Sequence, residues 1–350
     1  MIKRRIKFFL SAIFYYAAAF HLIRWWNILN GKRVTILTFH RVTAQKEEQD
    51  RQGLPTISIS AENFESLIRF LIRHYRIISM REFVNCAIKG VKVPGNSMII
   101  SFDDGYKELL ENALPVLRQY ELPAVLFVPT GAINDGGYFW WDALHALLQT
   151  ASTGLQFSRQ RSSDPAISNY LKMMDTIVAK KQDTRGPAIY QFIDKLQELN
   201  AELRERFLDH VFSSEKHQPY LPRVMTWHEI EEMSQAGWEI GSHTVNHQFL
   251  TSVPGDAALQ ELTRSKEEVE RRLNLEVFCF SYPGGKYSEE IVRLVQAAGY
   301  ACACNSDEGL NSINGNLFKL KRINISDDNV TDAKSRFSSA ITAWHLFLKR

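Results

Sequence analysis

The sequence has few cysteines, little net charge and no glycine-rich loop of the kind that holds phosphate. Its four cysteines among 350 residues show no zinc-knuckle spacing, and they neither establish nor exclude a disulfide. The formal net charge is only +3, and the basic residues are spread along the chain rather than clustered with aromatic ones. These absences, together with the lack of an RNA-binding motif, predict that the protein has no nucleic-acid partner.

The N-terminal apolar stretch, from Phe8 to Phe20, is shorter than the roughly 20 residues that span a bilayer. Basic residues precede it, and the pair Trp25 and Trp26 follows it. This pattern is compatible with a signal anchor, a cleaved signal peptide or an interfacial helix, and the alternative is a terminal helix that packs on the rest of the protein. We expect residues 1–30 to be membrane-associated, which would place the protein at a bacterial-type inner membrane or in the periplasm. A cytoplasmic location is the alternative.

Glycine and proline, at 18 and 11 residues, are too scarce for a disordered chain, and the 45% of hydrophobic residues can bury a large core. Short apolar runs alternate with helical patterns, which is typical of a parallel sheet or a closed α/β barrel. We expect strands at residues 34–39, 98–102, 124–128, 238–242, 277–281, 300–304 and 318–323. We expect helices between them at residues 61–75, 106–120, 257–273 and 288–298.

Two acidic residues follow one of these expected strands. Asp103 and Asp104 belong to the motif that runs from Ser101 to Tyr106, directly after an apolar run. Adjacent residues that leave a strand point in different directions, so one carboxylate can bind a cation while its neighbour accepts a proton. Taken alone, the pair is equally compatible with a turn that carries two solvated acids.

Two histidines follow another expected strand. His243 and His247 are four residues apart and can converge on one ion. Two imidazoles and one carboxylate are typical ligands of catalytic zinc, and they leave a fourth position for water or substrate. The two motifs together are much more specific than either one, and they indicate metal-assisted hydrolysis.

The two motifs resemble those of the polysaccharide deacetylases with a NodB-like domain, in which an Asp-Asp motif precedes a His-Ser/Thr-x-x-His motif. The resemblance covers about residues 34–330 and implies a distorted (β/α)7-type barrel. It also implies that Asp103 is the general base and that Asp104, His243 and His247 hold a divalent metal, with Zn²⁺ as the first expectation. The substrate that it implies is an N-acetylated glycan.

The third motif of the family is altered in this chain. Many members have Phe-Arg-Pro-Pro-Tyr-Gly where residues 280–285 read Phe-Ser-Tyr-Pro-Gly-Gly. The family's arginine, which steadies the catalytic Asp, falls on Ser281, and Arg322 is our candidate to replace it. A surface or salt-bridged arginine is the alternative for Arg322. The backbone N–H of Gly284 matches the position that faces the developing oxyanion in the family, with a plain turn as the alternative.

The family's C-terminal Leu-His motif, which supplies the general acid, has no match after Tyr282. The expected strand 34–39 instead ends at His40. This order resembles a circularly permuted branch of the family, the exopolysaccharide deacetylases that act on poly-N-acetylglucosamine, in which the histidine of the first strand takes the acid's place. We therefore predict that His40 is the general acid. The alternative is a hydrogen-bonded core histidine.

A long insertion, residues 131–222, is helical in pattern around residues 141–149, 166–180 and 188–211. Its first aromatic residues, Tyr138 to Trp141, either stack on sugar rings or anchor the insertion. The tail, residues 331–350, is a candidate amphipathic helix that packs on the domain or touches a membrane.

The sequence thus predicts a metal-dependent hydrolase that removes N-acetyl groups from the amino sugars of a polysaccharide. One alternative is a deacylase or deformylase of a lipid-linked sugar, which the N-terminus and the insertion favour. Another is a catalytically silent carbohydrate-binding barrel, which the missing arginine at Ser281 favours. The sequence identifies neither the glycan nor the oligomeric state.

Overall fold

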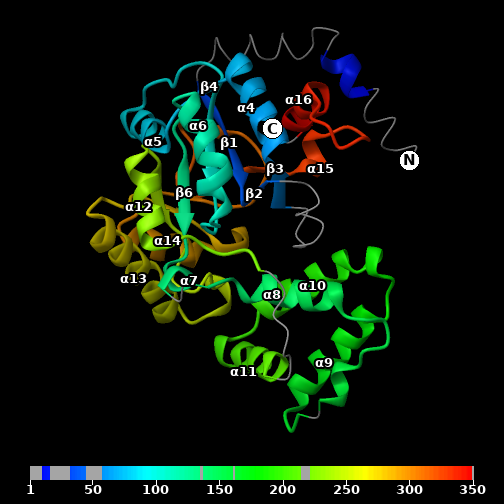
Figure 1. Cartoon of the computed structure of the whole chain (residues 1–350). Helices are drawn as coiled ribbons and strands as arrows, with labels where there is room; N and C mark the ends of the chain where they lie inside the picture. Colours follow the sequence, from blue (N-terminus) through cyan, green and yellow to red (C-terminus); the bar gives the residue numbers. More distant parts are fainter. Residues whose placement is uncertain are drawn as a thin grey trace. The chain divides into compact units, whose positions relative to one another are not determined.

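The computed structural model describes residues 10–15, 32–44, 57–134, 137–160, 162–213 and 221–348. The chain forms two compact units, which Figure 1 shows with their elements labelled. The first contains residues up to 46, 55–136 and 224–350, and the second contains residues 137–223 together with 47–54. Apart from a helical turn at residues 10–15, the expected membrane-associated segment lies outside the described residues.

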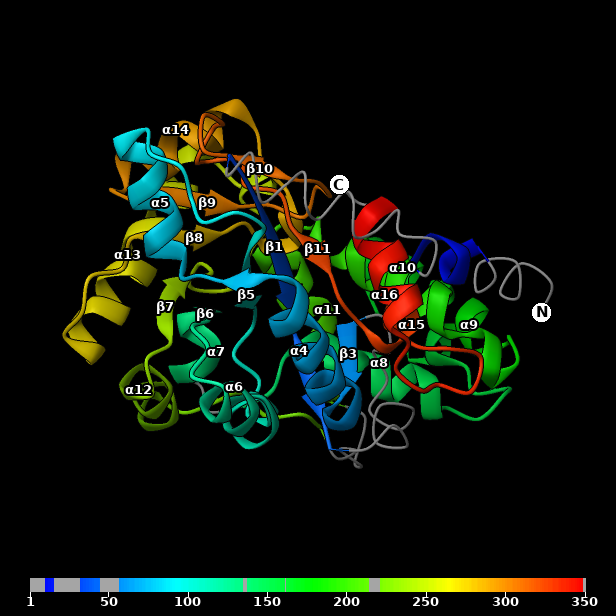
Figure 2. The same cartoon turned by 90° about the horizontal axis from the view of Figure 1, so that it is seen from above.

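The first unit is built on a parallel sheet whose strands are buried on both faces. Its main strands pair in the order β1 (Arg33–Phe39), β5 (Ser97–Phe102), β6 (Val125–Val128), β7 (Glu239–Ser242), β8 (Cys279–Ser281) and β9 (Cys302–Cys304). Apolar side chains fill both faces of these strands, as is usual where helices cover a parallel sheet. Figure 2 shows the strands following one another around the curled sheet.

Residues 317–324 connect the two edges of this sheet. Leu320 forms a parallel bridge with Cys304 at the end of β9. A few residues later, β11 (Ile323–Asn324) pairs with β1 through Leu37. The segment passes from β9 to β1, so the expected strand 318–323 is present only as this short strand. Seven paired segments of the described chain thereby form a distorted barrel, and the predicted fold class is confirmed.

Shorter strands complete the first unit. They are β2 (Arg41–Thr43), β3 (Ser58–Ser60), β4 (Arg76–Ile77) and β10 (Asn311–Ser312). β2 pairs with β3, β4 extends the sheet beside β5, and β10 runs antiparallel to the start of β1.

Amphipathic helices cover the outside of the barrel. They are α4 (Ala61–His74), α5 (Met80–Lys89), α6 (Leu114–Gln119), α7 (Thr130–Asn134), α12 (Trp227–Gln235), α13 (Gly255–Leu273), α14 (Glu289–Ala297), α15 (Asp327–Val330) and α16 (Ser339–Leu348). In α4, Phe64, Leu67, Ile68 and Leu71 are spaced to form one apolar face, and all four are fully buried.

The expected helix 106–120 has an irregular start. It opens with a π-helical turn, η2 (Leu109–Ala113), before α6 begins. Pro115 has no N–H to donate to the preceding turn, which fits the widened turn that comes before it.

The second unit is helical. Its main elements are α8 (Trp140–Thr150), α9 (Pro165–Val178), α10 (Gly186–Gln197) and α11 (Ala201–Phe212). The expected helix 188–211 is therefore two helices, because the Asn200 side chain caps α11 by accepting from the Leu203 N–H. The buried Arg185 guanidinium donates to the carbonyls of Ala151 and Val178, near the C-terminal ends of α8 and α9.

The aromatic residues at the start of the second unit are largely buried. Phe139 and Trp141 stack on each other with ring centroids 4.2 Å apart. Neither ring presents a free face to a sugar, whereas Tyr138 is 39% exposed.

The C-terminal helix is shorter than expected. α16 covers only residues 339–348, and Thr331 forms an antiparallel bridge with Phe337 ahead of it. No helix among the described residues is both long and apolar enough to cross a membrane.

Gly241 in β7 is required by close packing inside the barrel. A Cβ added there would lie 2.6 Å from the Phe127 ring and 2.9 Å from Cys279 Sγ. We predict that Gly241→Ala lowers the free energy of unfolding by about 1 to 3 kcal/mol in urea denaturation, as overpacking of a core does. Gly255→Ala, which would approach only the flexible end of Glu290, is the matched control. Equal stabilities of the two variants would contradict this account.

Candidate active site

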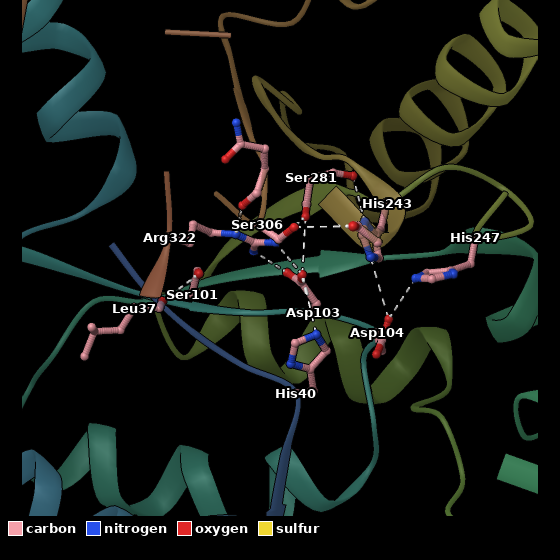
Figure 3. Close-up of polar contacts among 12 residues, drawn as sticks. Leu37, His40, Ser101, Asp103, Asp104, His243, His247, Ser281, Ser306 and Arg322 are labelled. Atoms are coloured by element: carbon pink, nitrogen blue, oxygen red, sulfur yellow. Dashed lines mark hydrogen bonds and ion pairs between the residues drawn. The ribbon is translucent and has the colours of Figure 1, made fainter. Parts of the chain in front are cut away.

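His40 and Asp103 meet because β1 and β5 pair in register. Phe39 lies opposite Phe102, and the N–H of Asp103 donates to the Phe39 carbonyl at 2.9 Å. The residue after each strand therefore emerges at the same edge of the barrel. Nε2 of His40 lies 4.0 Å from Oδ2 of Asp103. Figure 3 shows the His40 ring facing the Asp103 carboxylate.

Asp104 points to a different group of side chains. Its backbone has a φ of 71°, which is uncommon for a non-glycine residue, and this conformation turns the chain sharply after Asp103. Oδ1 of Asp104 lies 3.7 Å from Nε2 of His243 and 3.5 Å from Nε2 of His247. The three potential ligand atoms all lie within 4.8 Å of one another, and Figure 3 shows the imidazoles on one side of the carboxylate.

His243 presents an unprotonated nitrogen to Asp104. Nδ1 of His243 lies 2.7 Å from the Ser281 carbonyl and donates its proton there, so Nε2 keeps a lone pair. Burial lowers the pKa of His243, and burial followed by the neighbouring His243 lowers the pKa of His247. Both rings are therefore neutral at pH 7. A carboxylate and two neutral imidazoles fit a divalent ion such as zinc.

Arg322 forms a bidentate ion pair with Asp103. Its Nη1 and Nη2 donate to the two carboxylate oxygens of Asp103, each at 2.7 Å. Nη2 also donates to the Ser281 hydroxyl at 3.0 Å, and Nε donates to the Asn305 carbonyl at 3.0 Å. The Ser281 hydroxyl in turn donates to Asp103 at 3.3 Å. Arg322 thus contacts Asp103, the aspartate that the resemblance pairs with the family's arginine. In this chain Ser281 stands at the position of that arginine.

Burial and the neighbouring charges determine the protonation states of Asp103 and His40. Burial alone would raise the pKa of Asp103, but Arg322 and the nearby histidines outweigh it and lower that pKa well below its usual range. Burial lowers the pKa of His40 to about 4, against the attraction of the Asp103 carboxylate. At pH 7 the site therefore holds an ionised Asp103 and a neutral His40.

The His motif loop is fixed by contacts that the sequence analysis missed. The Glu261 side chain of α13 accepts from the backbone N–H groups of Val245 and Asn246, both at 2.9 Å. The N–H of Gly131 donates to the Val245 carbonyl, and a Cβ at Gly131 would lie 2.8 Å from that oxygen. These contacts stabilise a loop in which His247 has a φ of 50°. No sequence pattern distinguishes Glu261 from the other charged residues of its helix.

A second ion pair, between Arg41 and Glu108, involves the residue that follows His40 in the chain. Arg41 is fully buried, and its Nε donates to Glu108 Oε2 at 3.1 Å, while its Nη2 donates to Glu108 Oε1. Asn112 of η2 donates to the Val42 carbonyl at 2.7 Å. These contacts join β2, which begins directly after His40, to the segment that follows the two aspartates, so they position His40 relative to Asp103 and Asp104. The sequence analysis missed this pair as well, because its two halves are far apart along the chain.

Gly284 lies in the turn η6 (Pro283–Gly285), directly after β8 and Ser281. Its φ is 58°, and a Cβ there would lie 2.6 Å from the Phe249 ring. Both the backbone conformation and the space therefore require glycine at this position.

Several solved structures share this architecture. A Streptococcus pyogenes deacetylase, PplD, in complex with acetate matches with a TM-score of 0.57 over 91% of this chain and 97% of that one, at 18% identity. IcaB from Ammonifex degensii matches with a TM-score of 0.53 over 90% and 97% of the two chains, at 14% identity. At such identities, the similarity defines the class of fold, that of the deacetylase barrels.

Sequence comparison gives the family. The model of the family described as polysaccharide deacetylase matches residues 90–158 and 190–303, which is just over half of the 350 residues. The chain belongs to the polysaccharide deacetylase family, and the predicted membership is confirmed. Members of this family are hydrolases that act on carbon–nitrogen bonds other than peptide bonds.

A curated relative comes from Staphylococcus aureus. Its poly-beta-1,6-N-acetyl-D-glucosamine N-deacetylase is 30% identical over 142 residues, which are 40% of this chain and 44% of that protein. The chain thus spans less than half the length of the curated relatives it matches.

The Asp103–Arg322 pair should dominate the stability of this end of the barrel. We predict that Arg322→Met lowers the free energy of unfolding by about 3 to 5 kcal/mol, because it leaves a buried carboxylate without its cation. Ser281→Ala, which removes one hydroxyl from the same network, should cost only about 1 to 2 kcal/mol. Urea denaturation in the presence of a chelator measures both. Equal losses would show that the ion pair is not the main contribution.

Proposed function

We propose that this protein is a metal-dependent hydrolase that removes N-acetyl groups from the amino sugars of a polysaccharide, with poly-N-acetylglucosamine as the first candidate. The observation that carries the proposal is that two adjacent aspartates at one edge of the barrel have different neighbouring side chains. Asp104 faces two imidazoles, and Asp103 faces a cation and His40. The name of the S. aureus relative and the acetate in the S. pyogenes deacetylase structure support this reaction.

In this proposal, Asp104, His243 and His247 hold the metal, and Zn²⁺ is the ion that we propose. When bound, such an ion polarises the amide carbonyl and lowers the pKa of a water molecule. The protein supplies three largely buried candidate ligands, and the Ser281 carbonyl fixes the orientation of one of them, His243.

Asp103 is the proposed general base. Arg322 holds both of its oxygens, which keeps the carboxylate ionised and fixes its orientation. A carboxylate with so low a pKa is a weak base, and it therefore depends on a water molecule that has been made more acidic. It accepts the proton of that water as the oxygen attacks the acetamide carbon.

His40 is the proposed donor to the leaving nitrogen. Its neutral resting state makes it a relay: it accepts the proton that Asp103 has taken from water and passes that proton to the amine as the carbon–nitrogen bond breaks. Nδ1 of His40 is buried and has no hydrogen-bond partner among the described residues, so nothing there fixes one tautomer. The products are acetate and a free amino sugar. We assign the backbone N–H of Gly284 to the developing oxyanion, on the family resemblance of its turn.

The alternative of a silent carbohydrate-binding barrel loses its main argument. That reading depended on the missing arginine at Ser281. Arg322 contacts the Asp103 carboxylate from the closing segment 317–324, and Ser281 takes part in the network through its hydroxyl.

The roles of the two aspartates can be separated by substitution. We predict that Asp103→Asn lowers acetate release from N-acetylglucosamine oligomers by about 10²- to 10⁴-fold while zinc still binds, because the base is lost but the ligands remain. Asp104→Asn should lose zinc affinity and activity together, as should the wild type after chelation. Titration calorimetry measures zinc, and an enzymatic acetate assay measures turnover.

Three outcomes would count against these assignments. Retained turnover in Asp103→Asn would exclude it as the base. Zinc binding without acetate release by the wild type would favour a lipid-linked or otherwise specialised acyl sugar. Failure of the wild type to bind zinc would favour the silent barrel.

The role of His40 can be tested with a substrate whose leaving group needs no proton. We predict that His40→Ala loses most amide deacetylation but keeps hydrolysis of 4-nitrophenyl acetate, because nitrophenolate leaves unprotonated. Asp103→Asn, the matched variant, should lose both reactions. Equal losses of both reactions in His40→Ala would show that His40 does not act on the leaving group.

A further inference from the structure

The exposed apolar side chains of the first unit are concentrated at one place. Of the nine large apolar side chains that the described residues expose, four lie in the helical turn 10–15 and at the end of α16. They are Leu10 at 46%, Ile13 at 49%, Phe347 at 37% and Leu348 at 57% exposure. A soluble domain usually covers or avoids such a group of neighbouring apolar residues, so the group indicates an interaction surface.

The two segments are packed against each other. The Phe14 ring lies 4.6 Å from the Phe347 ring and 5.3 Å from the Trp344 ring, measured between centroids. On the next residue, the Tyr15 hydroxyl lies 3.5 Å from Nε2 of His74 in α4. Figure 1 shows the dark blue turn beside the red α16. Phe14 is buried by these contacts, whereas Leu10 and Ile13, one helical turn apart, remain exposed.

The sequence around both segments is basic. Lys3, Arg4, Arg5 and Lys7 come just before residues 10–15, and Lys349 and Arg350 come just after Leu348. No acidic residue occurs before Glu47 or after Asp332. Apolar side chains flanked by basic residues, in two stretches of sequence without acidic residues, match the acyl chains and headgroups of an anionic lipid surface, where each basic residue contributes about 1 kcal/mol.

We propose that Leu10, Ile13, Phe347 and Leu348 form a docking surface that lies on an anionic phospholipid membrane. The proposal rests on this surface alone and is independent of the proposed reaction. It assigns the first unit, and with it the catalytic residues, to the membrane surface.

The experiment is sedimentation of the full-length protein with lipid vesicles. Vesicles of phosphatidylcholine with about one third phosphatidylglycerol are compared with pure phosphatidylcholine, at low and at high salt. We expect binding to the anionic vesicles that weakens with salt. Ile13→Glu and Leu348→Glu should each weaken this binding about tenfold or more, because a carboxylate replaces an apolar contact next to anionic headgroups. Ile88→Glu is the matched control, since Ile88 is 68% exposed on α5.

Three results would overturn the proposal. Absence of wild-type binding would exclude a lipid surface and indicate that another part of the chain covers the patch. Equal binding of all three variants would show that the four residues do not carry the interaction. If light scattering instead finds a dimer that Ile13→Glu and Leu348→Glu both disrupt, the surface joins two copies of this chain.

Discussion

The ion pair between Arg322 and Asp103 is the interaction on which the site depends. Both side chains are almost completely buried, and an uncompensated charge there would be strongly unfavourable. The pair is stable because the guanidinium donates four hydrogen bonds: two join it to Asp103, a third reaches Ser281, and a fourth reaches the Asn305 carbonyl. These bonds tie β5, β8 and the closing segment 317–324 into one network. Geometry at the barrel edge is therefore set by electrostatics as much as by packing.

The adjacent residues Asp103 and Asp104 lie in different environments. Asp103 continues the direction of β5 and faces a cation of the protein, whereas the positive φ of Asp104 turns its carboxylate toward two imidazoles. Two buried carboxylates without such partners would repel each other and raise each other's pKa. The Arg322 guanidinium keeps Asp103 ionised. In our proposal, this division of environments gives proton transfer to Asp103 and ion binding to Asp104.

The parts of the site that follow strands could be predicted from the sequence. Apolar runs that end in Asp103, His243 or His40 locate those residues at one edge, because parallel strands deliver their C-terminal ends to the same side. Arg322 could be nominated because it lies in a strand-like run. Its contact with Asp103 was expected, but its bonds to Ser281 and Asn305 could not be predicted, since they depend on how that run crosses from β9 to β1. Glu261 was also beyond prediction, because its role depends on the packing of α13 against a distant loop.

The closure of the barrel has a consequence for how the protein is made. β1, which leads into His40, is synthesised before the other described strands of the barrel, whereas its neighbours on one side, β10 and β11, are synthesised after them. Until they emerge, β1 has an unpaired edge, which is a hazard for misassociation. Arg322 arrives with the same late segment, so Asp103 stays without its cation until then. A nascent chain therefore cannot complete its reactive centre early, and the enzyme becomes competent only once synthesis has passed the closing segment.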